Sequence, residues 1–201
     1  MHFALPAALV AALALAGTAA ADTPPEGWRD AIDAAVLPAI ADILAEPIVE
    51  YTVLAQNTRF AGFGQDRVDA LDTQWRAERE QDAQPLISAV LSNPVSTYLT
   101  RVQAQAIGLY TEIFVMDDLG LNVGQSNISS DFWQGDEAKW LETCAKGPGS
   151  VFVDEPELRD DIGAWVVQVN VSIDKDGAAI GASTFEVNLT ELARRRAAGL
   201  I

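Results

Sequence analysis

Apolar side chains occupy every second position of one segment in the C-terminal part of the chain: Trp165, Val167, Val169, Val171 and Ile173. A period of two is typical of a β-strand with one buried face. The turn signal Asp174-Lys175-Asp176-Gly177 follows, and residues 179–187 form a second apolar segment after it. The sequence therefore predicts an antiparallel hairpin of two long strands, 163–173 and 179–187.

The first half of the chain has a different period. Between residues 26 and 57 apolar residues recur at three- and four-residue spacing, which predicts helix. Pro38 and Pro47 should kink or break this helical segment, and Gly62 and Gly64 should end it. Further helices are predicted from Asp66, as N-cap, to about residue 80, over 85–91 and over 95–106.

The remaining elements are shorter. Residues 110–116 and 122–125 are predicted as two strands of a hairpin, residues 136–145 as a helix, residues 150–153 as a strand, and residues 190–198 as a terminal helix. The order of elements favours an α+β fold. We expect a five-stranded, mostly antiparallel sheet with helices on one face and a long N-terminal helical segment. The strand that ends at Met116 should lie beside the one that ends at Val187.

The N-terminal residues have the pattern of a secretory signal peptide. Residues 3–21 are apolar or small, the first charged side chain is Asp22, and Ala19-Ala20-Ala21 offers a cleavage site. The apolar run is short compared with the roughly 20 residues that cross a bilayer. We expect cleavage before Asp22, no membrane span in the mature chain, and a periplasmic or secreted product. An uncleaved anchor is the alternative.

Charge and the scarcity of two residue types argue against several functions. The chain has 13 Lys and Arg against 29 Asp and Glu, a net charge of −16. This disfavours nucleic acid and anionic lipid, since both are bound by clustered cations. The only His lies in the leader, so a His-based catalytic triad is impossible, and the lone Cys144 is expected to be an inert, buried thiol. No catalytic residue, metal site or cofactor is predicted.

Four segments carry a resemblance to a known family: "FVMDDLGLNVGQSN", "DFWQGDEAKW", "VFVDEPELRDDIGAWVVQVNVSI" and "DGAAIGASTFEVNL". Together with the order of elements, they resemble the extracytoplasmic PAS-like sensors of the Cache or PDC family over roughly residues 98–192. The resemblance implies a PAS-like sheet. It also implies three parts: a signal peptide (1–21), an N-terminal helical region (22–94) and a sensor domain (95–201) without a signalling module of its own.

The resemblance also implies a ligand pocket after the second strand. Family members that bind amino acids carry an aromatic residue, an Arg and a Trp-Tyr pair there, and an acid in the last strand. On this chain the aromatic residue is Trp133, the Trp of the pair is Trp140, and the last-strand acid is Glu186. A ligand is therefore expected between the sheet and residues 130–140, in contact with Trp133 and Glu186.

Two groups of ligand-binding residues in the family pattern differ in this chain. The Arg position is Ala138, with Lys139 beside it, and a Tyr-x-Asp after the third strand becomes Glu157-x-Arg159. This makes an α-amino acid ligand doubtful and leaves a pocket with aromatic walls.

The residue chemistry is compatible with such a pocket. Arg159 can hold a carboxylate bidentately, while Asp131, Asp136 or Glu186 can hold a cation. The alternative for both Trp133 and Trp140 is core packing between helix and sheet.

Three interpretations follow. The first is a small-molecule-binding sensor-like domain with a ligand of unknown identity, whose signal passes to a membrane sensor or transporter partner. The second is a non-catalytic protein that binds another exported or membrane protein. The third is a small exported enzyme, which would need two carboxylates that converge in a cleft with shifted pKa values.

Overall fold

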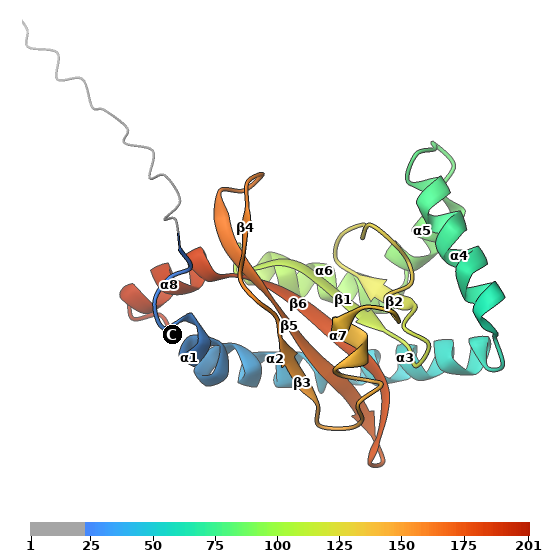
Figure 1. Cartoon of the computed structure of the whole chain (residues 1–201), viewed down its shortest axis with the longest axis horizontal. Helices are drawn as coiled ribbons and strands as arrows, with labels where there is room; N and C mark the ends of the chain where they lie inside the picture. Colours follow the sequence, from blue (N-terminus) through green and yellow to red (C-terminus); the bar gives the residue numbers. More distant parts are fainter. Residues whose placement is uncertain (1–22) are drawn as a thin grey trace, which may run out of the picture.

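The computed structural model describes residues 23–201 (Figure 1), so the predicted leader and its cleavage site lie outside the described residues. The first helices are α1 (Trp28–Ala31), the π-helical turn η1 (Ile32–Val36), α2 (Leu37–Leu44) and α3 (Pro47–Phe60). The interruptions predicted at both prolines are confirmed. Pro38 lies two residues after the end of η1, in a helical stretch that continues from Trp28 to Leu44, and its missing N–H removes a backbone hydrogen bond where the helix type changes. Pro47 opens α3, a position where a missing backbone N–H costs no helical hydrogen bond.

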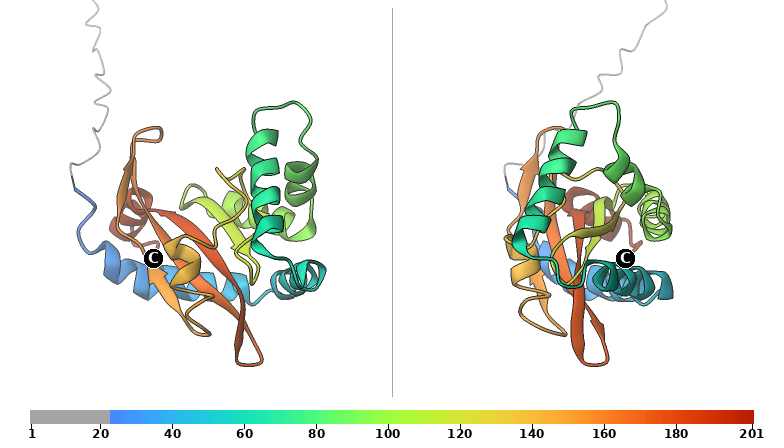
Figure 2. Two further views of the ribbon diagram at one scale, coloured as in Figure 1. Left: turned by 45° about the vertical axis from the view of Figure 1, so that its right-hand side comes forward. Right: turned by 90° about the vertical axis from the view of Figure 1, so that its right-hand side faces the viewer.

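Three more helices precede the sheet: α4 (Gln65–Glu78), α5 (Pro85–Leu91) and α6 (Pro94–Gln105). Figure 2 shows α4 and α5 side by side beyond the end of α3. The prediction that Asp66 caps α4 is wrong. The N-cap is Gly64, without a side-chain cap, and Asp66 lies in the first turn, where its charge still complements the helix dipole. Asn93 does cap α6, because its side chain accepts a hydrogen bond from the Ser96 N–H at 2.8 Å.

The sheet has six strands, and every pairing is antiparallel. They are β1 (Tyr110–Met116), β2 (Asn122–Gln125), β3 (Val151–Val153), β4 (Glu157–Arg159), β5 (Ala164–Lys175) and β6 (Ala178–Asn188). The order is β2-β1-β6-β5-β3, with β4 also paired to β5. The predicted fold class and the pairing of β1 with β6 are confirmed. The additional strand β4 has only three residues, too few for an alternating pattern to identify it in the sequence. It is extended because it pairs with the first residues of β5.

The turn between β5 and β6 has the predicted form. Its two residues, Asp176 and Gly177, have φ angles of 51° and 80°. Positive φ at both positions is the geometry of the two-residue hairpin turn whose twist matches that of its strands, and Asp-Gly is a preferred sequence for it. This turn joins the two longest strands, which form the centre of the sheet.

The two faces of the sheet are covered differently. The N-terminal helices and α6 pack on one face, where the main core holds buried residues such as Ile40, Val53, Leu99, Val169 and Phe185. Figure 1 shows α2 and α3 passing behind β5 and β6. The terminal helix α8 (Leu189–Ala197) adds Leu189 and Leu192 to this core.

The opposite face carries α7 (Ala138–Leu141) and the loops around it. The helix predicted over residues 136–145 is therefore much shorter than expected. After Leu141 the backbone continues in tight turns, in which Thr143 N–H bonds to Trp140 O and Lys146 N–H to Thr143 O. The Thr143 hydroxyl also bonds back to Lys139 O, an alternative that competes with helical bonding. Within residues 23–201, no helix combines the length and the apolar character needed to cross a bilayer.

Candidate ligand-binding site between α7 and the sheet

A row of polar side chains crosses the face of the sheet that carries α7. Glu112 of β1 is the register partner of Glu186 of β6, and Glu186 is the partner of Gln168 of β5. Residues directly opposite in antiparallel strands share a face. The next row toward α7 holds Phe114, which packs with Trp140 of that helix. The two glutamates therefore lie on the α7 side of the sheet, beside the helix.

Glu186 is buried and held by two donors. Its carboxylate Oε1 accepts hydrogen bonds from the Thr111 hydroxyl at 2.5 Å and from Arg159 Nη1 at 2.9 Å. Thr111 reaches it because the register of β1 shifts between Tyr110 and Glu112, and such an irregularity redirects a side chain. The other nitrogens of Arg159, Nε and Nη2, bond to Asp161 at 2.8 and 2.7 Å.

Glu112 lies opposite Glu186, in an environment that disfavours its ionised form. Burial, and then the negative charge of Glu186, raise the pKa of Glu112 to about 6, while Lys139 and Arg159 lower it. The cause is general, since removing a carboxylate from water and placing a like charge beside it both disfavour its ionised form. Glu112 is therefore the carboxyl group of this pair whose pKa the fold raises.

A hollow of about 210 Å³ lies between α7, the loop before β4, and strands β5 and β6. Its charged lining consists of five carboxylates and one ammonium group: Glu137, Asp154, Glu155, Glu157, Glu186 and Lys139. The ammonium is already engaged, because Lys139 Nζ lies 2.9 Å from Glu137 Oε2 and 3.1 Å from Gln134 Oε1. A second, wider hollow adjoins it and is lined by Glu112, Arg159 and the same Glu186.

Three of the residues singled out from the sequence line the smaller hollow: Lys139, Glu157 and Glu186. Arg159 lines the adjoining one, but its guanidinium is occupied by Asp161 and Glu186, so it presents no open clamp for a ligand carboxylate. Asp136 is exposed and lines neither hollow.

The remaining three predicted residues lie elsewhere. Trp140 packs α7 onto the sheet and donates its indole N–H to Asp117 O at 3.2 Å. Trp133 packs at the turn between β1 and β2, with its indole N–H on Leu119 O at 2.9 Å. Asp131 faces α4, where its carboxylate lies 3.2 Å from Arg76. The structure does not bring Trp133 and Glu186 to the same hollow.

Sequence reasoning missed Glu112, Gln168 and the acids of the loop before β4. The alternation of residues 110–116 does carry a signal for Glu112, because it places that residue on the face opposite the buried Ile113 and Val115. The cross-strand register that sets Glu112 against Glu186 has no counterpart in the sequence. The same face holds Cys144, which packs against the small cluster of Phe114, Met116 and Ala182. Cys144 is half-buried, where the sequence predicted a buried thiol, and desolvation raises its pKa to about 12, as expected for an inert thiol.

No protein-family model matches the chain, and no curated protein matches its sequence. Solved structures do resemble its fold. The ligand-binding domain of the Campylobacter jejuni chemoreceptor Tlp3, in complex with 4-methylisoleucine, has 17% identity and a TM-score of 0.38 over 75% of this chain and 64% of that one. The ligand-binding domain of the Pseudomonas aeruginosa chemoreceptor PctC, in complex with GABA, has 12% identity and a TM-score of 0.35 over 71% and 59%.

The sensor domain of the V. cholerae histidine kinase DctB has 11% identity and a TM-score of 0.34 over 72% of this chain and 57% of that one. The chain thus spans less than two thirds of each of these three domains.

Proposed function

We propose that the chain is a small-molecule-binding, sensor-like domain of the periplasm or the secreted space, and that its ligand is a small organic amine bound between α7 and the sheet. One observation carries the proposal: the hollow beside Glu186 is lined by five carboxylates and a single ammonium group that is already paired. A cleft lined by one sign of charge concentrates ligands of the opposite sign.

The chemistry of the lining sets the ligand class. Ionised carboxylates only accept hydrogen bonds, and a protonated amine only donates them. A cation in the hollow would also offset the repulsion between Glu112 and Glu186. An anionic ligand would meet an excess of negative charge and a guanidinium that Asp161 and Glu186 already occupy.

We infer binding without catalysis. Facing glutamates with one raised pKa are what an acid–base pair would need. Glu186, however, accepts two hydrogen bonds on one oxygen, from Thr111 and from a charged guanidinium. Both donors hold the carboxylate in place. A side chain held by two donors suits a fixed group that orients a ligand better than one that must move during a reaction.

A thermal-shift panel tests the proposal. It contains putrescine, ethanolamine and choline as amines, succinate as a carboxylate, and L-valine and GABA as zwitterions named with the neighbouring structures. An amine at 100 times its dissociation constant should stabilise the fold by about 2.7 kcal/mol. If only succinate raises the thermal unfolding midpoint, the predicted positive charge of the ligand is wrong. A panel without any effect would favour the alternative, a non-catalytic interaction protein.

Matched substitutions locate the site. Glu157→Gln removes an exposed carboxylate from the lining, and we expect it to weaken amine binding severalfold. Glu80→Gln, two residues after the end of α4, should leave binding unchanged. Lys139→Met removes the competing ammonium and should strengthen amine binding. Its control is Lys146→Met, which breaks a comparable ion pair with Glu142 outside the hollow. Equal effects of a substitution and its control would contradict this placement.

A further inference from the structure

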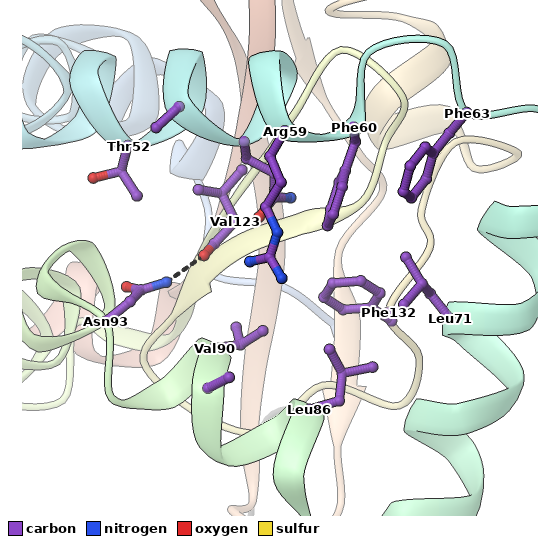
Figure 3. A pocket seen from close by; sticks show the side chains of 13 residues that line it. Thr52, Arg59, Phe60, Phe63, Leu71, Leu86, Val90, Asn93, Val123 and Phe132 are labelled. Atoms are coloured by element: carbon purple, nitrogen blue, oxygen red, sulfur yellow. Dashed lines mark hydrogen bonds between the residues drawn. The ribbon is translucent and has the colours of Figure 1, made fainter.

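A separate apolar hollow of about 470 Å³ lies between α3, α4, α5 and β2. Its volume falls within the range of roughly 300–1,000 Å³ that is usual for small-molecule sites. The wall is largely aromatic and aliphatic, as Figure 3 shows: Phe60, Phe63, Leu71, Leu86, Val90 and Phe132. It shares no lining residue with the two hollows beside Glu186.

The neutral polar side chains of this wall already have partners. Gln56 Nε2 donates to Asp117 Oδ2 at 2.9 Å, Asn93 Nδ2 to Val123 O at 2.6 Å, and the Thr52 hydroxyl to Ile48 O at 2.7 Å. These groups stabilise the surrounding structure. They leave little hydrogen-bonding capacity for a ligand.

Arg59 differs from them. Its side chain extends from α3 into the hollow (Figure 3), with Cζ 5.4 Å from the centroid of the Phe60 ring. Phe60 stacks on Phe63 at 4.8 Å, and Arg67 lies over Phe63 at 5.1 Å. Within residues 23–201, neither guanidinium donates a hydrogen bond or forms an ion pair, although acids outnumber bases by 16 in the sequence.

Taken together, these features define the chemistry of an occupant. A guanidinium binds a carboxylate through two parallel hydrogen bonds, and Arg59 has all its donors available. The wall around it would exclude water from an apolar chain. We propose that this hollow binds a small amphipathic anion, a monocarboxylate whose apolar tail lies among Phe60, Leu86 and Phe132 and whose head binds Arg59. This second site goes beyond the amine site, and its ligand has the opposite charge.

Calorimetric titration of the purified chain with sodium octanoate tests the proposal, with 1-octanol and octylamine as probes of the same chain length. Octanoate should bind at least tenfold more tightly than either. If 1-octanol binds as tightly as octanoate, the hollow is a general apolar site and the role of Arg59 is wrong. If octanoate does not bind, the proposal fails.

Substitutions assign the contacts. Arg59→Met keeps an unbranched side chain without the charge, and we expect octanoate affinity to fall about tenfold to a hundredfold, as for loss of a charged hydrogen-bonded contact. Arg101→Met is the matched control, an exposed arginine on α6 that does not line the hollow. An unchanged affinity of Arg59→Met, or an equal loss in Arg101→Met, would overturn the assignment.

A second pair of variants tests the hollow itself. Ala89 is an exposed residue of α5 that lines it, so Ala89→Trp should block octanoate without disturbing the core. Its neighbour Ser88 is exposed and does not line the hollow, and Ser88→Trp should bind octanoate normally. Unchanged thermal midpoints show that the variants fold. Octanoate binding to Ala89→Trp with the affinity of the unmodified chain would refute the site.

Discussion

Glu112 of β1 and Glu186 of β6 face each other across the strand pair, so that two carboxylates meet beside α7. Like charges directly opposite in a sheet are unfavourable. The arrangement persists here because Arg159 and Thr111 hold Glu186, while the pKa of Glu112 rises to about 6. The pair therefore costs stability when both groups are ionised, and a bound amine would offset that cost.

The stability of the chain should depend on the protonation of Glu112. Its pKa is higher in the folded chain, about 6, than its ordinary value of 4.5. Between these values the folded state binds more protons than the unfolded state, so the contribution of Glu112 to the free energy of unfolding falls as pH rises. The loss is complete above about pH 6 and amounts to at most about 2 kcal/mol.

Glu112→Gln should remove this loss. Urea unfolding should show the variant to be more stable than the unmodified chain at about pH 7.5 and equally stable at about pH 4. Glu191→Gln is a control for which we expect the opposite change in stability. Arg194 and Arg195 lower the pKa of Glu191 to about 2, so its removal should destabilise the chain at neutral pH. The same gain for Glu112→Gln at both pH values would show that ionisation is not the cause.

Trp133 should act as a packing residue at the turn between β1 and β2. Trp133→Ala removes its contacts with the second core and its hydrogen bond to Leu119 O, and should lower the free energy of unfolding by about 3 kcal/mol. Trp133→Phe keeps most of the packing and should cost about 1 kcal/mol. Binding of an amine should be unaffected. A stable Trp133→Ala variant that no longer binds the ligand would instead support the pocket role expected from the sequence.

Gly181 should tolerate no side chain. A Cβ at this position of β6 would lie 2.2 Å from the carbonyl oxygen of Met116 and 3.1 Å from Val53. Because the obstacle is a backbone atom, β1 and β6 would have to separate. Gly181→Ala should therefore lower the free energy of unfolding by about 1–3 kcal/mol. Gly64→Ala is the control, since no atom lies within 4 Å of its Cβ position. Equal stability of the two variants in urea would contradict the close packing of β1 on β6.

The leader should be removed on export. The apolar run and Ala19-Ala20-Ala21 predict cleavage before Asp22, which leaves 180 residues, residues 22–201. Intact mass of the protein recovered from the periplasm or medium checks this. A chain that begins at Met1 and sediments with membranes would show that the leader is an anchor.

Much of the fold could be predicted because it depends on local patterns. The alternation around Val167 and Val169 and the Asp176-Gly177 turn specify a strand, its buried face and its hairpin within a few residues, since successive side chains of a strand point to opposite faces. Prolines 38 and 47 set the helix interruptions for an equally local reason. The segment after Gly135 could not be predicted as well, because packing of Trp140 on the sheet and the turns after Leu141 decide where α7 ends.

The candidate site also has a part that the sequence could predict and a part that it could not. The sequence by itself determined the acidic character of the chain and predicted that Glu186 lies on a strand, which the structure confirms. The role of Glu186 in ligand binding stays a prediction. Only the tertiary structure decided that Glu112 is its partner and that Arg159 is occupied by Asp161. It also decided that Trp133 packs at the β1–β2 turn and lines neither hollow beside Glu186. Strand register and side-chain pairing join residues tens of positions apart, and they follow from packing the whole sheet against its helices. Periodicity within one segment carries no information about them.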